Sequence, residues 1–268
     1  MSAIITDKIR ILNTQNFLDL AEDTENNAFY AFIGLPNPTD VVATWDTSPP
    51  APKDSFEQEF DYWDTMIAMK KISSEDIRQV IRKITWSSGT TYDMYRHDIS
   101  RTNLAKPSNA TSLYSSNFYV MNSDFRVYIC LQNGTDPETP DGKPSLDEPL
   151  FTDLEPQIPG DSGDGYVWKY LYTIKPSDIV KFDSVNFIPV PKNWETDTTF
   201  DSIRDNAETS GQIKIVTIKD RGAGLGTGGI TYANIPISGD GEGAECTIVV
   251  NNDSKVDSIT VSDGGEGY

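Results

Sequence analysis

Residues 117–131 read NFYVMNSDFRVYICL, and this stretch decides the fold class. Its aromatic and β-branched residues favour extended backbone, and Asn122–Asp124 supplies turn residues in the middle. We therefore predict two strands around that turn. In the second strand, alternate apolar residues fall on one face of a sheet: Phe125, Val127, Ile129 and Leu131.

A further aromatic strand is predicted at residues 165–174, which read GYVWKYLYTI. Its alternate residues share one face, which favours core packing over a partner interface: Tyr166, Trp168, Tyr170 and Tyr172. Residues 185–190 form another short apolar run, closed by Pro189 and Pro191.

The N-terminal part is predicted to mix helices with one strand. Residues 6–22 read as a helix that Thr6 caps, and residues 28–33 read as a strand that ends at Gly34. Prolines crowd residues 36–53, which predicts a loop because proline disrupts both helix and central strand. The first helix carries part of an apolar stripe: Ile9, Leu12, Phe17 and Leu20.

Two more helices are predicted before the β-rich part. One covers residues 55–71, where apolar residues recur at helical spacing: Phe56, Phe60, Trp63 and Ile67. The other begins near Ser73, which forms a capping-box pattern with Asp76. Its expected buried stripe is Ile77, Val80, Ile81 and Ile84.

A long acidic, proline-rich loop is predicted at residues 133–164. A loop of this length in a compact protein is functional, disordered or ordered by a partner. Its carboxylates permit calcium binding, but they lack the spacing of an EF-hand, so a solvated loop is the simpler interpretation.

The chain becomes glycine-rich from about residue 211 and contains an internal repeat. Residues 216–225 (VTIKDRGAGL) and 259–268 (ITVSDGGEGY) share a β-branched strand followed by Asp and glycines. With strands expected at 232–237 and 246–250, one period predicts a β module of about four strands. We expect a core domain at residues 1–210 and this module at 211–268, incomplete because it stops inside the second copy.

Composition and charge exclude several function classes. The formal charge of −19 disfavours binding to nucleic acid and to anionic membranes. Cys130 and Cys246 lie in apolar runs, which predicts buried thiols and a reducing site of synthesis. We find no apolar stretch long enough to span a membrane and no secretory leader in residues 1–10.

No motif predicts a catalytic centre, a metal site or a cofactor. His97 is the only histidine and lacks a nucleophile motif, so a surface or structural role is expected. Gly224, Gly226 and Gly229 match a dinucleotide-binding pattern, but β-type sequence follows where a helix is required. A tight turn explains these glycines better.

Three features together resemble a known family: the prolines at 49–52, WSSGTTYDMY at 86–95 and GDGYVWKYLYTI at 163–174. In this order they resemble the dimeric baseplate wedge proteins of T-even-like contractile-tailed bacteriophages. The resemblance covers roughly residues 1–200 and does not extend to the glycine-rich end.

The resemblance implies an α+β, predominantly β fold of antiparallel sheets or a sandwich with N-terminal helices. It also implies a homodimer that contacts other baseplate wedge proteins, a place in the virion tail baseplate after assembly in the host cytoplasm, and no catalysis. By hypothesis, one group of residues docks a partner and another lies beside the dimer axis. The interface candidates are Trp45, Pro49 and Pro50 for docking, and Trp86, Tyr92 and Tyr95 for the dimer.

Two other function classes remain open at the level of sequence. One is a carbohydrate-binding or receptor-binding tail module, for which Tyr232 and Tyr268 are the aromatic residues in the glycine-rich part. The other is a cell-wall hydrolase that uses a pair of the 41 acidic residues.

Overall fold

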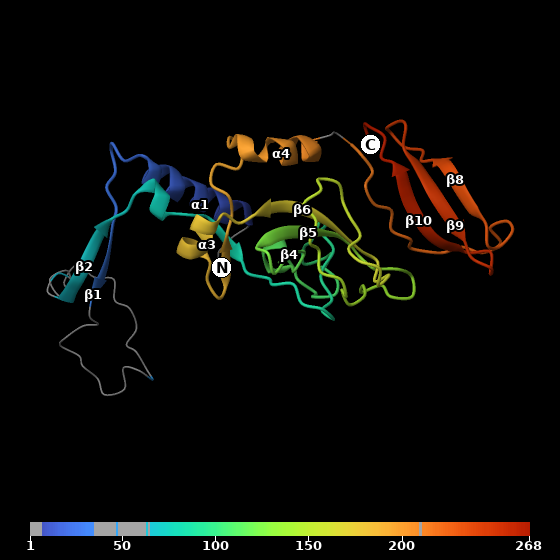
Figure 1. Cartoon of the computed structure of the whole chain (residues 1–268), viewed down its shortest axis with the longest axis horizontal. Helices are drawn as coiled ribbons and strands as arrows, with labels where there is room; N and C mark the ends of the chain where they lie inside the picture. Colours follow the sequence, from blue (N-terminus) through green and yellow to red (C-terminus); the bar gives the residue numbers. More distant parts are fainter. Residues whose placement is uncertain (1–6, 35–46, 48–62, 64, 209–210) are drawn as a thin grey trace. The chain divides into compact units, whose positions relative to one another are not determined.

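A computed structural model of the chain divides into two compact units, residues 1–78 and 79–268 (Figure 1). The residues that the structure describes are 7–34, 47, 63, 65–208 and 211–268. Each unit is described by itself below. The predicted domain boundary at residue 211 stays a prediction.

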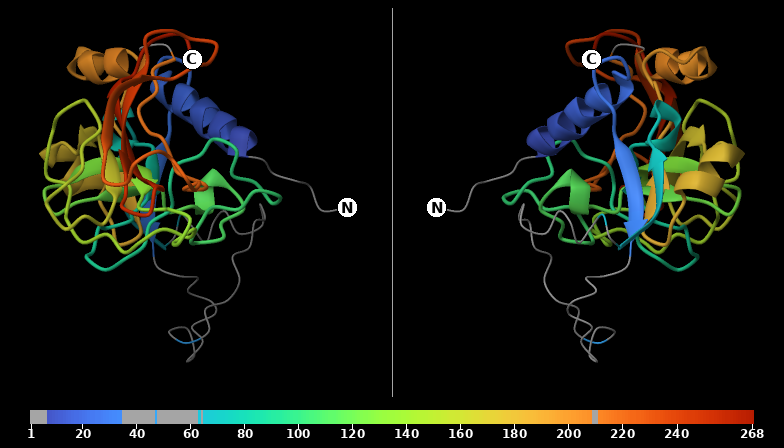
Figure 2. Two further views of the ribbon diagram at one scale, coloured as in Figure 1. Left: turned by 90° about the vertical axis from the view of Figure 1, so that its right-hand side faces the viewer. Right: turned by 90° about the vertical axis from the view of Figure 1, so that its left-hand side faces the viewer.

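The first unit contains one helix and a two-stranded sheet. Helix α1 (Asp7–Glu22) and strand β1 (Tyr30–Gly34) confirm the predicted helix at 6–22 and the strand at 28–33. Strand β2 (Met66–Lys71) pairs antiparallel with β1, as Figure 2 shows in its right-hand view. The ring of Phe17 on α1 contacts the ring of Phe29, with 5.9 Å between centroids.

The predicted helix at 55–71 is wrong over its last turns. Trp63 and Thr65 are helical, but Met66–Lys71 is strand β2. The rest of that prediction, with the loop at 36–53 and the Thr6 cap, lies outside the described residues except for Thr47, which is a turn residue. Pairing with β1 explains the difference, because a neighbouring strand overrides a local helical pattern.

The predicted helix from Ser73 is also wrong beyond its first turn. The capping box exists: the Asp76 carboxylate accepts hydrogen bonds from the Ser73 amide at 3.0 Å and the Ser73 hydroxyl at 2.8 Å. The helix is a single 3-10 turn, η3 (Ser74–Asp76), and the chain then extends into strand β3 (Val80–Arg82). The β-branched residues of the expected stripe pair with strand β7 (Phe187–Pro189) instead.

The second unit is built on a three-stranded antiparallel sheet in the order β4-β5-β6. Strands β4 (Tyr119–Met121) and β5 (Arg126–Asn133) confirm the predicted pair around Asn122–Asp124. Strand β6 (Tyr166–Thr173) confirms the aromatic strand. Both faces of this sheet are covered, because residues of all three strands enter buried clusters on either side.

Irregular pairing between β5 and β6 replaces the simple alternation that the sequence predicts. The register shifts between Val127 and Tyr128, where one residue on β5 opposes two on β6. Val127 and Tyr172 therefore lie in one buried cluster, whereas Tyr128 and Trp168 lie in the other. The prediction that the four aromatic residues of β6 share one face is wrong for this reason.

The glycine-rich part forms a three-stranded antiparallel sheet in the order β10-β9-β8. Its strands are β8 (Thr231–Pro236), β9 (Glu245–Val250) and β10 (Val256–Asp263). The second repeat copy lies largely on β10, but the first copy, residues 216–225, forms no regular strand. The module thus has three strands rather than about four.

Short helices complete the second unit. They are η4 (Leu113–Ser115), α3 (Pro176–Phe182), η5 (Thr198–Phe200) and α4 (Asp201–Glu208). The fold is therefore α+β and predominantly β with antiparallel sheets, as the sequence predicts. Cys130 and Cys246 are buried free thiols, which confirms that prediction. None of the described helices has the length and apolar character to cross a bilayer.

Candidate interaction surfaces

The structure places the six interface candidates in different environments. Trp45, Pro49 and Pro50 lie outside the described residues. Trp86 is half-buried: its indole donates a hydrogen bond to Ser145 Oγ at 3.0 Å. Tyr95 is exposed along one edge while its ring packs on Phe118, with 5.2 Å between centroids.

Tyr92 is a core residue. Its side chain is 2% exposed, and its ring packs edge-on against Trp168 and Tyr166 at centroid distances of 5.7 and 6.4 Å. Its hydroxyl accepts a hydrogen bond from the Ser87 amide at 2.7 Å. Within this chain it therefore supports Trp86 and Tyr95 from beneath and offers no surface of its own.

Tyr166 and Trp168 are likewise fully buried, in agreement with the expectation that they are core residues. The Tyr166 hydroxyl donates to the Lys143 carbonyl at 2.8 Å and accepts from the Tyr92 amide at 2.9 Å. Burial raises the pKa of Tyr166 far above its usual range, so the hydroxyl stays protonated and keeps both bonds.

The acidic loop at 133–164 is ordered by contacts within this chain. Buried Asp164 accepts hydrogen bonds from the amides of Leu146 at 2.8 Å and Tyr166 at 2.9 Å. Tyr128 donates to the Phe151 carbonyl at 2.6 Å, which holds the middle of the loop on the sheet. A partner is therefore not required to order it.

The described residues provide little for catalysis or ligand binding. No group of three or more His, Cys, Asp and Glu side chains among them is placed to hold a metal ion. His97 is exposed. Burial raises the pKa of the Cys130 thiol well above its usual value, which makes it a poor nucleophile. Gly224, Gly226 and Gly229 precede strand β8, not a helix, which fits the tight-turn interpretation.

Sequence analysis missed the largest set of exposed apolar residues, which lies in the first unit. On α1 the predicted stripe forms but faces solvent, with Ile9, Leu12, Phe17 and Leu20 between 44% and 58% exposed. We call these residues, together with the exposed apolar side chains of β1 and β2, the N-terminal apolar surface. The strand members are Tyr30, Phe32, Ile33, Ile67 and Met69.

The glycine-rich sheet has few exposed aromatic residues. Tyr232 is 37% exposed, whereas the Tyr268 hydroxyl donates to the Ile237 carbonyl at 2.8 Å and its ring lies close to Gly239. Sugar-binding surfaces stack ligands on exposed rings, so this sheet gives the carbohydrate hypothesis little support.

Comparison with protein families gives one match. The model of the family described as bacteriophage T4 Gp8 matches residues 3–143, which is more than half of the chain. The matched residues include the first unit and, in the second, strands β3, β4 and β5. No protein with a curated description matches the sequence.

Proposed function

This chain belongs to the bacteriophage T4 Gp8 family, a family of structural baseplate proteins, and from that premise we propose that it forms a homodimer which links neighbouring wedge proteins. It is a structural component of a phage baseplate. The proposed dimer would act during baseplate assembly and sheath contraction. The proteins it links would be other wedge subunits.

The N-terminal apolar surface is the observation that carries the proposed association. Soluble monomers rarely leave many large apolar side chains exposed on one small unit, because each one orders water unfavourably. On α1 alone the exposed stripe spans three helical turns. Burial against another protein would remove this cost, as it does in permanent subunit interfaces.

Trp86 and Tyr95 remain proposed contacts for a second surface, as do Trp45, Pro49 and Pro50. Large aromatic residues with one polar edge are common at binding hot spots. Trp86 and Tyr95 stand on the buried Tyr92, so they are held rigidly and lose little entropy on binding.

The test is the molar mass of the purified chain by light scattering across a micromolar concentration series. We expect a dimer for the natural sequence. We expect Leu12→Glu with Phe17→Glu to shift it to monomer, because both side chains are about half exposed on α1. Val185→Glu is the matched control, since Val185 is 90% exposed in the other unit.

Circular dichroism would establish that each variant is folded. A monomer at every concentration for the natural sequence would contradict the homodimer. A double variant that remains dimeric would exclude α1 from the interface. Binding to other purified wedge proteins, measured by calorimetry, tests the proposed linking role separately.

A further inference from the structure

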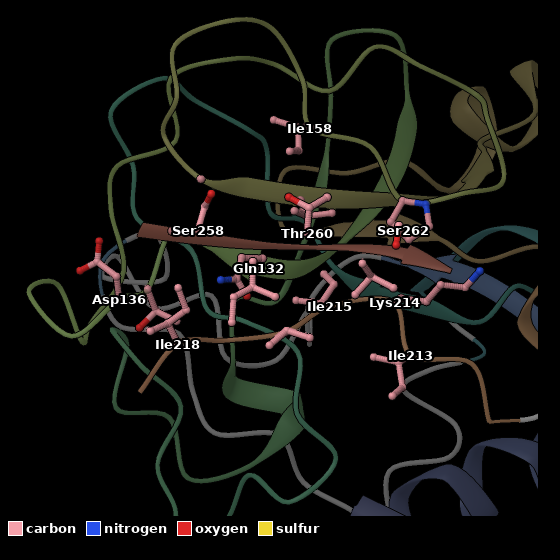
Figure 3. Close-up of a pocket in the computed structure, with 18 of the residues that line it drawn as sticks. Gln132, Asp136, Ile158, Ile213, Lys214, Ile215, Ile218, Ser258, Thr260 and Ser262 are labelled. Carbon is pink, nitrogen blue, oxygen red and sulfur yellow. The ribbon is translucent and has the colours of Figure 1, made fainter. Parts of the chain in front are cut away.

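Residues 213–221, here called the strap, run beside strand β10 at the edge of the C-terminal sheet (Figure 3). Backbone hydrogen bonds join the two segments at both ends. The Ile213 amide donates to the Gly264 carbonyl at 2.9 Å, and the Val256 amide donates to the Arg221 carbonyl at 3.0 Å. Both bonds belong to one antiparallel register, since the two strap residues and their two partners are equally far apart in sequence.

Between these ends, no described backbone group of the strap bonds to β10. The pairing of β10 with β9 gives the reason. The register shifts between Val256 and Ser258 and again between Val261 and Asp263. Each such bulge turns the following backbone groups to the opposite side of the strand. The middle of β10 is therefore out of phase with the strap, and the ladder stays open there.

The strap side chains bind the core instead. Lys214 Nζ lies 2.6 Å from Glu155 Oε2, and the Thr217 hydroxyl donates to Gln132 Oε1 at 3.1 Å. Glu155 belongs to the acidic loop and Gln132 to strand β5. The hydrogen bond from Lys214 lowers the pKa of Glu155, so this pair is fully ionised at neutral pH.

Arg221 bonds to both sides of the joint. Its Nε lies 3.0 Å from one oxygen of Glu138 and 3.1 Å from the other, on the acidic loop of the core. Its Nη1 donates to the carbonyls of Val256 at 2.9 Å and Asp257 at 2.6 Å, on β10. The guanidinium is 19% exposed, so one side chain clamps the C-terminal sheet to the core.

Packing contributes little to this joint. A cavity of about 570 Å³ lies between the strap, β10 and the core, lined by Val167, Ile215 and Ile259 among others. The three buried hydrophobic clusters contain no residue beyond Ile203. A joint with a cavity and few apolar contacts depends on its polar bonds, and partly exposed ion pairs are weak and sensitive to salt.

We propose that the C-terminal sheet is a docked module, which the strap holds on the core chiefly through Arg221 and which undocks while remaining folded. Undocking frees the outer edge of β10 and lets the module change orientation. The device is independent of the proposed dimer, since the dimer involves the first unit.

Amide hydrogen exchange of the full chain, followed by mass spectrometry, tests the proposal. In Glu138→Gln, peptides covering the strap and residues 136–139 should exchange at least about tenfold faster, and Arg221→Ala should give the same result. Peptides of β9 and of the β4-β5-β6 sheet should be unchanged. Lys70→Ala is the matched control, because Lys70 pairs with Asp76 at 2.5 Å in the first unit.

Salt gives a second readout. Raising sodium chloride from about 50 to 500 mM should speed strap exchange in the natural sequence and have little effect in Arg221→Ala. Unchanged exchange in both variants would overturn the proposal. So would equally fast exchange in β9, because that result would mean that the module unfolds rather than undocks.

Discussion

Asp93 shows how one buried carboxylate organises a long irregular segment. It is fully buried and accepts four hydrogen bonds, all from residues 108–117. The donors are the Ser108 amide at 2.9 Å, the Ser108 hydroxyl at 2.6 Å, the Ser116 hydroxyl at 2.8 Å and the Asn117 amide at 2.7 Å. Hydrogen bonding on this scale offsets the cost of burying the charge.

Asp93→Asn should therefore destabilise the protein by about 2–4 kcal/mol, because an amide nitrogen replaces one acceptor and faces donors. Urea denaturation measures the change in the free energy of unfolding. Asp141→Asn is the control: Asp141 pairs with Lys106 at 3.0 Å on the surface, and its loss should cost less than about 0.5 kcal/mol. Equal effects of the two substitutions would contradict this role for Asp93.

Buried tyrosines predict a loss of stability at high pH. Burial raises the pKa of Tyr119 and of Tyr128 to about 12, and each hydroxyl donates to a carbonyl, of Arg82 and Phe151 respectively. In the unfolded chain these groups ionise near pH 10. Their stabilising contribution is therefore complete below about pH 10 and is lost as pH rises from about 10 to 12.

The measurement is the melting temperature between about pH 8 and 12, together with tyrosinate absorbance. We expect a steep fall above about pH 10 that is smaller in Tyr119→Phe, which has no hydroxyl to ionise. A melting curve with the same alkaline slope in both proteins would argue against this explanation.

At the scale of elements, glycines at positive φ let the acidic loop fold tightly against β6. Gly134 has φ +70°, and a Cβ there would lie 2.2 Å from the Asp164 carbonyl oxygen. Gly163 has a similar φ of +68° but no neighbouring atom within 4 Å of that position. The two glycines thus separate backbone strain from steric contact.

Gly163→Ala should cost about 1 kcal/mol, from the left-handed backbone alone. Gly134→Ala should cost at least about 2 kcal/mol more, because the loop must also move away from Asp164. Chemical denaturation of both variants gives the comparison. Similar costs would mean that the loop adjusts freely at Gly134, contrary to its hydrogen bonding.

The helix-to-strand differences also belong to this scale. Residues 66–71 and 80–82 carry apolar residues at spacings compatible with a helix, yet each forms a strand with a distant partner, β1 and β7 respectively. Such pairing depends on residues up to about a hundred positions away, which a local pattern does not contain.

At the scale of the whole molecule, the core of the second unit is complete without the glycine-rich module. Its buried clusters end at Ile203, and the strap contributes partly exposed polar bonds. A chain that ends at residue 210 should therefore fold, with a loss of no more than about 2–3 kcal/mol. Circular dichroism and a cooperative urea transition would show this, and an unfolded or aggregated product would contradict it.

The amino-acid sequence by itself determined the strands of the central sheet, the first helix, the buried thiols and the absence of a recognisable catalytic motif. These depend on local composition and periodicity, and the family match over residues 3–143 agrees with the resemblance drawn from short motifs. Only the tertiary structure decided that Tyr92 is core, that the α1 stripe is exposed and that Arg221 joins two parts of the chain. Burial and long-range contacts are properties of how segments meet, and hydrophobicity along the chain predicts which residues are apolar but not which of them find a neighbour.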